Sequence, residues 1–343
     1  DSDFVYKQTI KAKACDSIRG LLPAATLSNV GMYGTGQAYE ALLLRMKAHP
    51  LPEIREYAHL MLTELRKVIP SFLARVDRAD RGGVWVKYFE ETREDVGSEM
   101  ERIFGDEHKG GTVEPTSVAL TDFDPDGEDK VVAAILYSQS HKSEEALLDD
   151  VKKMSTEDKI AIITAYVGDR SNRRHKPGRA FERTDYRFDV LSDYGAFRDL
   201  QRHRMLTIEW QQLTPYHGYD VPESVVEAGV QDKFEGLLGV SSNLFDALSQ
   251  RFPTGASYAV ALQFKIRYVM QMNAREAMHL TELSSAPQGH PAYRDVAQQM
   301  HTLVAEKAGH KAIAAAMKYV DYEVYELERL AAERAAEKKR TSV

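Results

Sequence analysis

Two segments of the chain repeat one another, and this self-similarity sets its organisation. Residues 37–44 read Gln-Ala-Tyr-Glu-Ala-Leu-Leu-Leu, and residues 273–280 read Asn-Ala-Arg-Glu-Ala-Met-His-Leu. A proline-led segment follows each of them, at residues 52–56 and 291–295. A repeat of this kind predicts two copies of one structural unit within the chain.

Hydrophobic periodicity predicts helices in much of the chain. Residues 37–78 and 84–104 place apolar side chains on one helical face, and residues 312–339 form a long segment rich in alanine, glutamate and arginine. Residues 131–137 are apolar and fit either a strand or a helix, so both readings stay open. Glycines, prolines and acids between residues 105 and 130 are typical of a boundary. We expect an α+β fold with much helix.

Composition excludes several classes of protein. The chain has 343 residues, is 43% hydrophobic and carries a formal charge of −7, which provides no general attraction to nucleic acid or to an anionic membrane. Its one cysteine, Cys15, cannot form an internal disulfide and suits a reducing compartment. No apolar run reaches the roughly 20 residues of a membrane span. We expect a cytoplasmic protein.

The cluster Arg202-His203-Arg204, followed by Thr207, indicates a particular chemistry. The preceding residues 186–200 alternate apolar and polar side chains and then become helical, so the cluster should project from a positioned element. Arginine presents forked donors that match phosphate oxygens. The cluster therefore predicts a clamp for a phosphate or a flavin, with structural ion pairs as the alternative.

No metal site is expected, because the histidines show no ligand-spaced pair with open geometry. Residues 122–127 begin like a calcium loop, but its twelfth position is Ala133 instead of glutamate. A basic run lacks the aromatic ladder of a nucleic-acid site. We expect that run to be a solvated loop or the outer rim of an anion pocket: Arg170, Arg173, Arg174, His175, Lys176 and Arg179.

Three segments together resemble the flavin-dependent thymidylate synthases. Residues 202–207 are similar to the family's Arg-His-Arg-x-x-Ser signature, with threonine replacing serine. Residues 175–183 resemble its His-x-Ser-Pro-Phe-Glu-His segment with two residues inserted and Arg183 in place of the second histidine. Residues 273–279 are similar to its Asn-Ala-Arg-x-x-x-His helix. The three segments also stand in the family's order.

This resemblance implies FAD as the cofactor and a reaction without a protein nucleophile. The family methylates dUMP to dTMP with methylenetetrahydrofolate, and NADPH reduces the flavin. Arg202 and His203 are the implied catalytic residues, and the guanidinium groups of Arg202, Arg204 and Arg275 should surround the dianionic pyrophosphate. The implied cofactor-binding residues are Arg202, His203, Arg204, Thr207, Glu182, Asn273, Arg275 and His279.

The substrate side departs from the family pattern. Arg19 heads a segment like the family's Arg-x-x-Leu-Pro, whose arginine contacts substrate phosphate, and Asp199 stands where a glutamine faces the base. Gln212 occupies a nucleotide-gripping position, so Arg19, Asp199 and Gln212 are the implied substrate-binding residues. Charge or hydroxyl groups of the family are absent at four positions: Trp210, Gln212, Thr214 and Ser284.

The resemblance also divides the chain. Residues 1–105 look like the C-terminal half of a first synthase-like copy, residues 106–130 like a linker, and residues 131–335 like a complete second copy. Because the chain begins at Asp1 within a domain, we expect a fragment of a longer tandem protein. Several subunits surround each flavin in the family, so a homo-oligomer is implied, with tandem copies mimicking a tetramer.

Two further functional classes compete with a synthase. The lost substrate-binding groups favour a paralogue that binds flavin or nucleotide as a sensor or an assembly subunit. A purely structural, helical interaction protein would leave Arg202-His203-Arg204 without an explanation.

Overall fold

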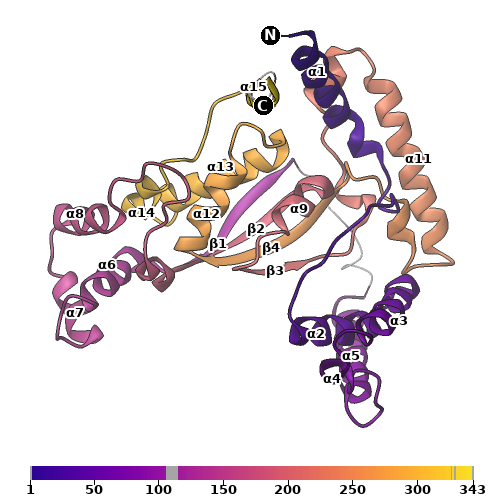
Figure 1. Cartoon of the computed structure of the whole chain (residues 1–343), viewed down its shortest axis with the longest axis horizontal. Coiled ribbons are helices and arrows are strands. Elements are labelled where there is room, and N and C mark those ends of the chain that lie inside the picture. The colour runs from indigo at the N-terminus through magenta and orange to yellow at the C-terminus, as the bar shows by residue number, and fades with distance from the viewer. Residues whose placement is uncertain (1, 106–114, 326, 328–329, 342–343) are drawn as a thin grey trace. The chain divides into compact units, whose positions relative to one another are not determined.

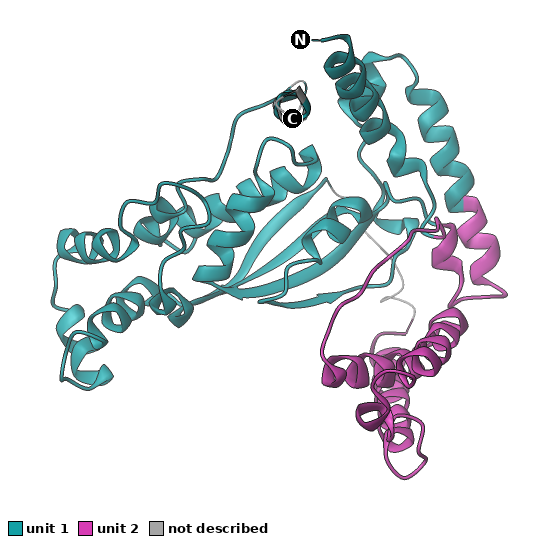
Figure 2. Cartoon of the chain, viewed as in Figure 1, with its two compact units in different colours: residues 1–24, 113–242, 260–343 teal, residues 25–112, 243–259 magenta. Residues whose placement is uncertain are grey.

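The computed structural model describes residues 2–105, 115–325, 327 and 330–341, and it contains two compact units (Figure 2). Unit 1 comprises Asp1–Ala24, Val113–Ser242 and Val260–Val343, and unit 2 comprises Ala25–Thr112 and Asn243–Ala259. Helices predominate beside one small sheet, so the prediction of a helix-rich α+β fold is confirmed.

Unit 1 contains a four-stranded antiparallel sheet in the order β1-β2-β4-β3 (Figure 1). Along β2, the predicted alternation is present, because Tyr186, Phe188 and Val190 are buried. The strands are β1 (Ser117–Phe123), β2 (Asp185–Asp193), β3 (Thr207–Trp210) and β4 (Lys265–Asn273).

Three helices of unit 1 pack against the sheet: α9 (Tyr194–Leu200), α12 (Ala274–Ser284) and α13 (Pro291–Glu306). The other helices of this unit are α1 (Asp3–Ile18), α6 (Gly127–Tyr137), α7 (Glu144–Val151), α8 (Thr156–Val167), α10 (Glu223–Glu227), α14 (Lys311–Ala316) and α15 (Leu330–Thr341). Short 3-10 helices are η1 (Arg19–Leu21), η3 (Arg179–Arg183) and η4 (Pro215–His217). Helix α11 (Gln231–Ser249) has residues in both units.

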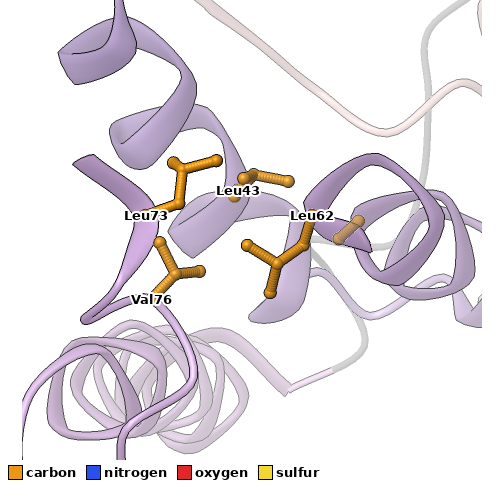
Figure 3. Packing of buried hydrophobic residues seen from close by; sticks show 5 residues of the cluster. Leu43, Leu62, Leu73 and Val76 are labelled. Atoms are coloured by element: carbon orange, nitrogen blue, oxygen red, sulfur yellow. The ribbon is translucent and has the colours of Figure 1, made fainter. Parts of the chain in front are cut away.

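Unit 2 is helical in the part of the chain that the structure describes. Its helices are α2 (Gly36–Lys47), α3 (Pro52–Leu65), α4 (Pro70–Leu73) and α5 (Gly82–Phe104), together with η5 (Ala256–Ala259). An apolar cluster, shown in Figure 3, joins α2, α3 and α4: Leu43, Ala58, Leu62, Leu73 and Val76. The predicted helical regions at residues 37–78 and 84–104 therefore correspond to α2 through α5.

The repeated segments adopt the same local structure. Residues 37–44 lie in α2, and residues 273–280 span the end of β4 and most of α12. In each case the proline-led segment begins the next helix, α3 at Pro52 and α13 at Pro291, and the two helices of each pair pack together. The residues left open at 131–137 are helical, within α6.

Two expectations about local structure are wrong. The predicted linker at 106–130 contains β1 and the start of α6, although residues 106–114 lie outside the described residues. The single helix expected at 312–339 is interrupted after α14. The backbone amides of Tyr319 and Asp321 instead donate to Glu282 Oε1 (3.3 Å) and Ser285 Oγ (3.0 Å), which diverts the chain. None of the helices in the described part of the chain combines the length and the apolar composition of a membrane span.

Candidate functional site

The site begins where β4 ends and α12 starts. Asn273 is the last residue of β4, and its side-chain oxygen accepts a hydrogen bond from the Glu276 amide (2.9 Å). Asparagine is a preferred N-cap because it satisfies an amide that the helix leaves unpaired. This cap, and the pairing of Asn273 with Asp185 in the sheet, fix the direction in which α12 presents its first two turns.

Two histidines and a carboxylate meet at the first two turns of α12. The Nδ1 atom of His203 lies 3.2 Å from Glu276 Oε1, and the two side chains are only 7% and 9% exposed. The rings of His203 and His279 meet edge to face, with centroids 5.5 Å apart. One potential ligand atom of each of these three residues lies within 4.8 Å of the others.

The surroundings of His279 disfavour protonation of its imidazole. Burial is the main reason that its pKa is lowered, and the ammonium group of Lys176 lowers this pKa further. Burial also lowers the pKa of Lys176 itself, although the carboxylate of Glu276 opposes that shift. The Nδ1 atom of His279 is buried and has no hydrogen-bond partner among the described residues. It is therefore available to a ligand.

The segment at 175–182 docks onto the same end of α12. The Nε atom of Arg275 donates to the Pro177 carbonyl (2.9 Å), and its Nη1 lies 3.5 Å from Glu182 Oε1. Glu182 also accepts a hydrogen bond from Arg179 Nε at 3.0 Å. Glu182 thus joins two guanidinium groups, and residues 175–182, 202–207 and 273–279 come together in unit 1.

The arginines of the signature are more exposed than the histidine between them. The Arg202 side chain is 74% exposed and is hydrogen-bonded to Asp199. Arg204 is exposed and has no ion pair among the described residues, and Thr207 is exposed at the start of β3. Two of the three guanidinium groups expected around a dianion therefore already have carboxylate partners. The Arg202 side chain is largely exposed, and such surface pairs contribute only about 0–1 kcal/mol, so an incoming anion can displace its partner.

One member of the basic run does not line a rim. Arg170 is fully buried and makes a two-point pair with Glu282, with Nη1–Oε1 at 2.7 Å and Nη2–Oε2 at 2.6 Å. It also donates to the carbonyl oxygens of Arg173, His175 and Ala316. The expectation of a solvated or rim position is therefore wrong for Arg170, which anchors the loop that carries Lys176.

A second group of charges surrounds Tyr293 on α13. Burial raises the pKa of Tyr293, the carboxylate of Asp199 raises it further, and Arg19 and Arg202 act in the opposite direction. Arg19 is exposed, with Nη1 3.1 Å from Asp16 Oδ1. The structure therefore brings three sequence-predicted residues, Arg19, Asp199 and Arg202, into the electrostatic range of one phenol.

The remaining substrate-side positions differ in accessibility. Gln212 is exposed after β3. Trp210 is 52% exposed, with its ring 5.7 Å from that of Phe197. Ser284 is buried near the end of α12, with 5% of its surface exposed.

Sequence reasoning missed three residues of this region: Glu276, Glu282 and Tyr293. Glu276 could have been found, since Glu276 and His279 are three positions apart and such positions share one helical face. His203 and His279 are distant in sequence, and Glu276 completes with them a group of three potential ligand atoms that no local spacing indicates.

A family model and three curated relatives match most of this chain. A profile described as "Thymidylate synthase complementing protein" matches residues 2–71 and 119–309. A UPF0159 protein of Chlamydia pneumoniae is 38% identical over 85% of this chain and 55% of its own length. One from Chlamydia muridarum is 37% identical over 96% and 61%. One from Thermoplasma acidophilum is 29% identical over 96% and 64%, so the chain spans less than two thirds of these relatives.

Solved structures give weaker similarities. The UMP/dUMP methylase PolB of Streptomyces cacaoi, bound with 5-Br dUMP, is 18% identical with a TM-score of 0.47, over 62% of this chain and 100% of PolB. Thymidylate synthase X of Helicobacter pylori, with FAD and dUMP, is 16% identical with a TM-score of 0.44, over 59% and 99%. The profile match covers more than half of the chain, so this chain belongs to the thymidylate synthase complementing protein family, the flavin-dependent thymidylate synthases.

Proposed function

We propose that unit 1 binds FAD and acts as a thymidylate synthase of this family, methylating dUMP with methylenetetrahydrofolate and NADPH. One observation carries the proposal: residues 175–182, 202–207 and 273–279, which resemble the family's motifs, meet at the start of α12. The linking contacts are Arg275 with Pro177 and Glu182, and His203 with Glu276 and His279.

The residues present fit an anionic cofactor. Arg204 is exposed and unpaired among the described residues, and the displaceable pair of Arg202 leaves its forked donors available to phosphate oxygens. The free Nδ1 atom of His279 offers a further polar contact. When bound, FAD would supply the hydride that reduces the transferred one-carbon group. The chain would contribute orientation and fixed charge.

The charged residues around Tyr293 form the proposed binding site for the nucleotide. Arg19 and Arg202 would hold the phosphate of dUMP, while Asp199 and Gln212 would contact the base. Arg202 would then contribute to the binding of both cofactor and substrate. A homo-oligomer, in which tandem copies take the places of separate subunits, belongs to this proposal. The two separate segments of the profile match support two copies.

The alternative is a paralogue that binds flavin or nucleotide without making thymidylate. The burial of Ser284 favours it, because a buried serine at the position of the family's late arginine cannot polarise a pyrimidine. The exposed indole of Trp210, where the family has a nucleotide-binding polar group, points the same way.

Titration with FAD, followed by absorbance, tests cofactor binding. We expect Arg204→Ala and Arg275→Ala each to weaken binding roughly 10- to 100-fold, since a hydrogen bond to a charged group contributes about 1.5–3 kcal/mol. Arg251→Ala, at an exposed arginine of unit 2, is the matched control and should leave the affinity unchanged. If the wild-type chain does not bind FAD, the proposal is wrong.

Turnover separates the two functions. Tritium release from labelled dUMP, in the presence of methylenetetrahydrofolate, NADPH and FAD, reports replacement of the hydrogen on the pyrimidine. Release that disappears in Arg202→Ala supports a synthase. FAD binding without release at saturating substrates assigns the chain to the non-synthase alternative.

A further inference from the structure

Glu276 contacts His203 but is not among the residues assigned to the cofactor or to the substrate. Its Oε1 atom lies 3.2 Å from His203 Nδ1, and the side chains of Glu276 and His203 are only 9% and 7% exposed. A hydrogen bond that is removed from water is stronger than one at the surface, because little solvent screens it. The pair therefore gives the histidine of the signature a fixed support.

The backbone holds both partners of this pair in place. Glu276 stands in the first turn of α12, and its amide donates to the capping oxygen of Asn273 at 2.9 Å. His203 follows α9, and its amide donates to the Leu200 carbonyl at 3.1 Å. The ring of His279 packs edge to face against the ring of His203. The imidazole of His203 is thus oriented by a hydrogen bond at one nitrogen and by a ring contact.

The carboxylate determines which nitrogen of His203 carries the proton. A carboxylate oxygen accepts hydrogen bonds, so Nδ1 donates the N–H that lies between the two groups. In a neutral imidazole the other nitrogen, Nε2, then keeps its lone pair. This atom has no hydrogen-bond partner among the described residues and, unlike Nδ1 of His279, it is not sealed from solvent. Nε2 of His203 is therefore available to accept a hydrogen bond from a ligand.

An acceptor at this position suits only some groups of a flavin or a nucleotide. Ring N–H groups and ribose hydroxyls can donate a hydrogen bond to it, whereas the oxygens of an ionised phosphate only accept. The guanidinium groups of Arg202 and Arg204 have the opposite character, because they only donate. The signature thus presents forked donors that suit phosphate and, between them in sequence, one acceptor that suits a ring or a ribose.

The repeated segment contains the same glutamate in a different environment. Glu40 of α2 corresponds to Glu276, but its Oε1 atom lies 3.7 Å from Arg75 Nη2 and its side chain is 23% exposed. There the glutamate forms a partly exposed ion pair with an arginine. Burial of this glutamate against an imidazole therefore belongs to the copy that also carries the family's motifs.

We propose that Glu276 is a positioning residue, which holds His203 with Nδ1 protonated and with Nε2 as the acceptor for an N–H or O–H group of the bound ligand. The inference rests on the proposed function for the identity of that ligand, which is FAD or dUMP. The competing role for Glu276 is a purely structural one, in which the pair stabilises unit 1 without any effect on the state of His203.

NMR of the chain labelled with ¹⁵N-histidine tests the location of the proton, because the two tautomers differ in their nitrogen chemical shifts. We expect the His203 signal, identified by its disappearance in His203→Gln, to show protonation at Nδ1. Glu276→Gln preserves the size of the side chain, but an amide can donate as well as accept, so the preference for this tautomer should be lost. Glu40→Gln, at the matched position of α2, should leave the signal unchanged.

Titrations with FAD and with dUMP separate positioning from a purely structural role. Glu276→Gln should weaken the binding of at least one of the two ligands about 2- to 12-fold, the loss expected for one hydrogen bond. In a His203→Ala background the same substitution should have no further effect, because the positioned group is absent. Glu40→Gln should leave both affinities unchanged.

The results that would overturn the proposal are distinct from those that would overturn the proposed function. Protonation of wild-type His203 at Nε2 alone, unchanged affinity of Glu276→Gln for both ligands, or losses that add in the double variant would refute positioning. Circular dichroism verifies that Glu276→Gln is folded. If the wild-type chain binds neither ligand, the proposed function fails, and the NMR measurement, which needs no ligand, decides the state of His203.

Discussion

Helices α12 and α2 carry the same sequence pattern but use it differently. Four of the eight aligned positions are identical between residues 37–44 and 273–280. Both helices have a capping side chain: Thr35 accepts from the Ala38 amide and Asn273 from the Glu276 amide. In α12 one face holds polar side chains of the site, whereas the corresponding face of α2 is packed into an apolar cluster.

The contrast is sharpest at the position of His279. Its counterpart in α2 is Leu43, which is 0% exposed and lies within the cluster shown in Figure 3. Glu282 likewise corresponds to Met46, which packs against that cluster. One helix thus retains buried polar groups that need specific partners, and the other replaces them with side chains that need only space. We therefore expect the buried polar side chains of α12 to serve a ligand.

The largest effect should come from breaking the buried pair of α12. Glu282→Gln leaves the Arg170 charge uncompensated, and removing one partner of a buried pair costs about 3–5 kcal/mol. Urea denaturation would measure the loss of stability, and hydrogen exchange should locate it in α12 and at residues 317–321. Glu306→Gln, at an exposed acid of α13, is the control. A loss of unfolding free energy below about 1 kcal/mol is typical of a surface pair. Such a result would contradict the conclusion that Arg170 and Glu282 form a buried, unhydrated pair.

Leu43→Ala tests the apolar counterpart. Removing a fully buried leucine costs about 2–5 kcal/mol, depending on how far the cavity collapses. Hydrogen exchange should show the loss in α2, α3 and α4, while FAD affinity stays unchanged. Leu60→Ala, which truncates a half-exposed leucine of α3, should cost much less. Equal losses from the two variants would mean that the Leu43 cluster is not a specific core.

Replacing either capping residue should lower stability by a similar amount, but only the replacement of Asn273 should also lower FAD affinity. Asn273→Ala and Thr35→Ala should each cost about 0.5–2 kcal/mol, because each removes an acceptor for a helix amide. Only Asn273→Ala should also weaken FAD binding, since its cap positions the site. Asn273→Asp should restore stability by providing an equivalent acceptor. A loss of FAD affinity in Thr35→Ala would contradict the assignment of FAD binding to unit 1.

The smallest effect concerns pH and the buried His310 of unit 1. Burial lowers the pKa of His310, while Glu128 and Asp124 oppose this shift, and Tyr186 Oη lies 2.8 Å from its Nδ1. Because the unfolded state binds this proton more readily, stability should fall as pH drops below about 6.5. His310→Gln should flatten that slope by less than about 1.4 kcal/mol per pH unit. An unchanged slope between pH 7 and pH 5, in paired denaturation curves, would refute this assignment.

Local signals predicted much of the fold. The alternation of Tyr186, Phe188 and Val190 corresponds to β2, and the apolar period at residues 37–78 corresponds to α2 through α4. Strand β1 was missed because it lies at the edge of the sheet and only Leu120 among its residues is buried. An edge strand with one buried side chain carries little hydrophobic signal in a region rich in acids and glycines.

Long-range contacts explain what the sequence did not predict about the site. The ion pair of Arg202 with Asp199 joins positions three apart, a spacing at which side chains meet on a helix. The sequence therefore leaves an ion pair of Arg202 open as the alternative to a phosphate or flavin clamp. The pair Arg170–Glu282 joins positions that are distant in the chain, so no local pattern indicates it. The same holds for His203 with Glu276, whereas the motifs correctly predicted the family of the chain.

The junction at Asn273 makes the site sensitive to chain length as well as to residue type. Asn273 is paired within the sheet and also begins α12, so no spacer separates the strand from the helix. One inserted residue after Asn273 would turn every later side chain by about 100° around the helix axis. Such an insertion would carry Glu276 and His279 away from His203 while leaving the hydrophobic content of the helix intact. Homologues that use this site should therefore tolerate substitutions here far more readily than insertions or deletions.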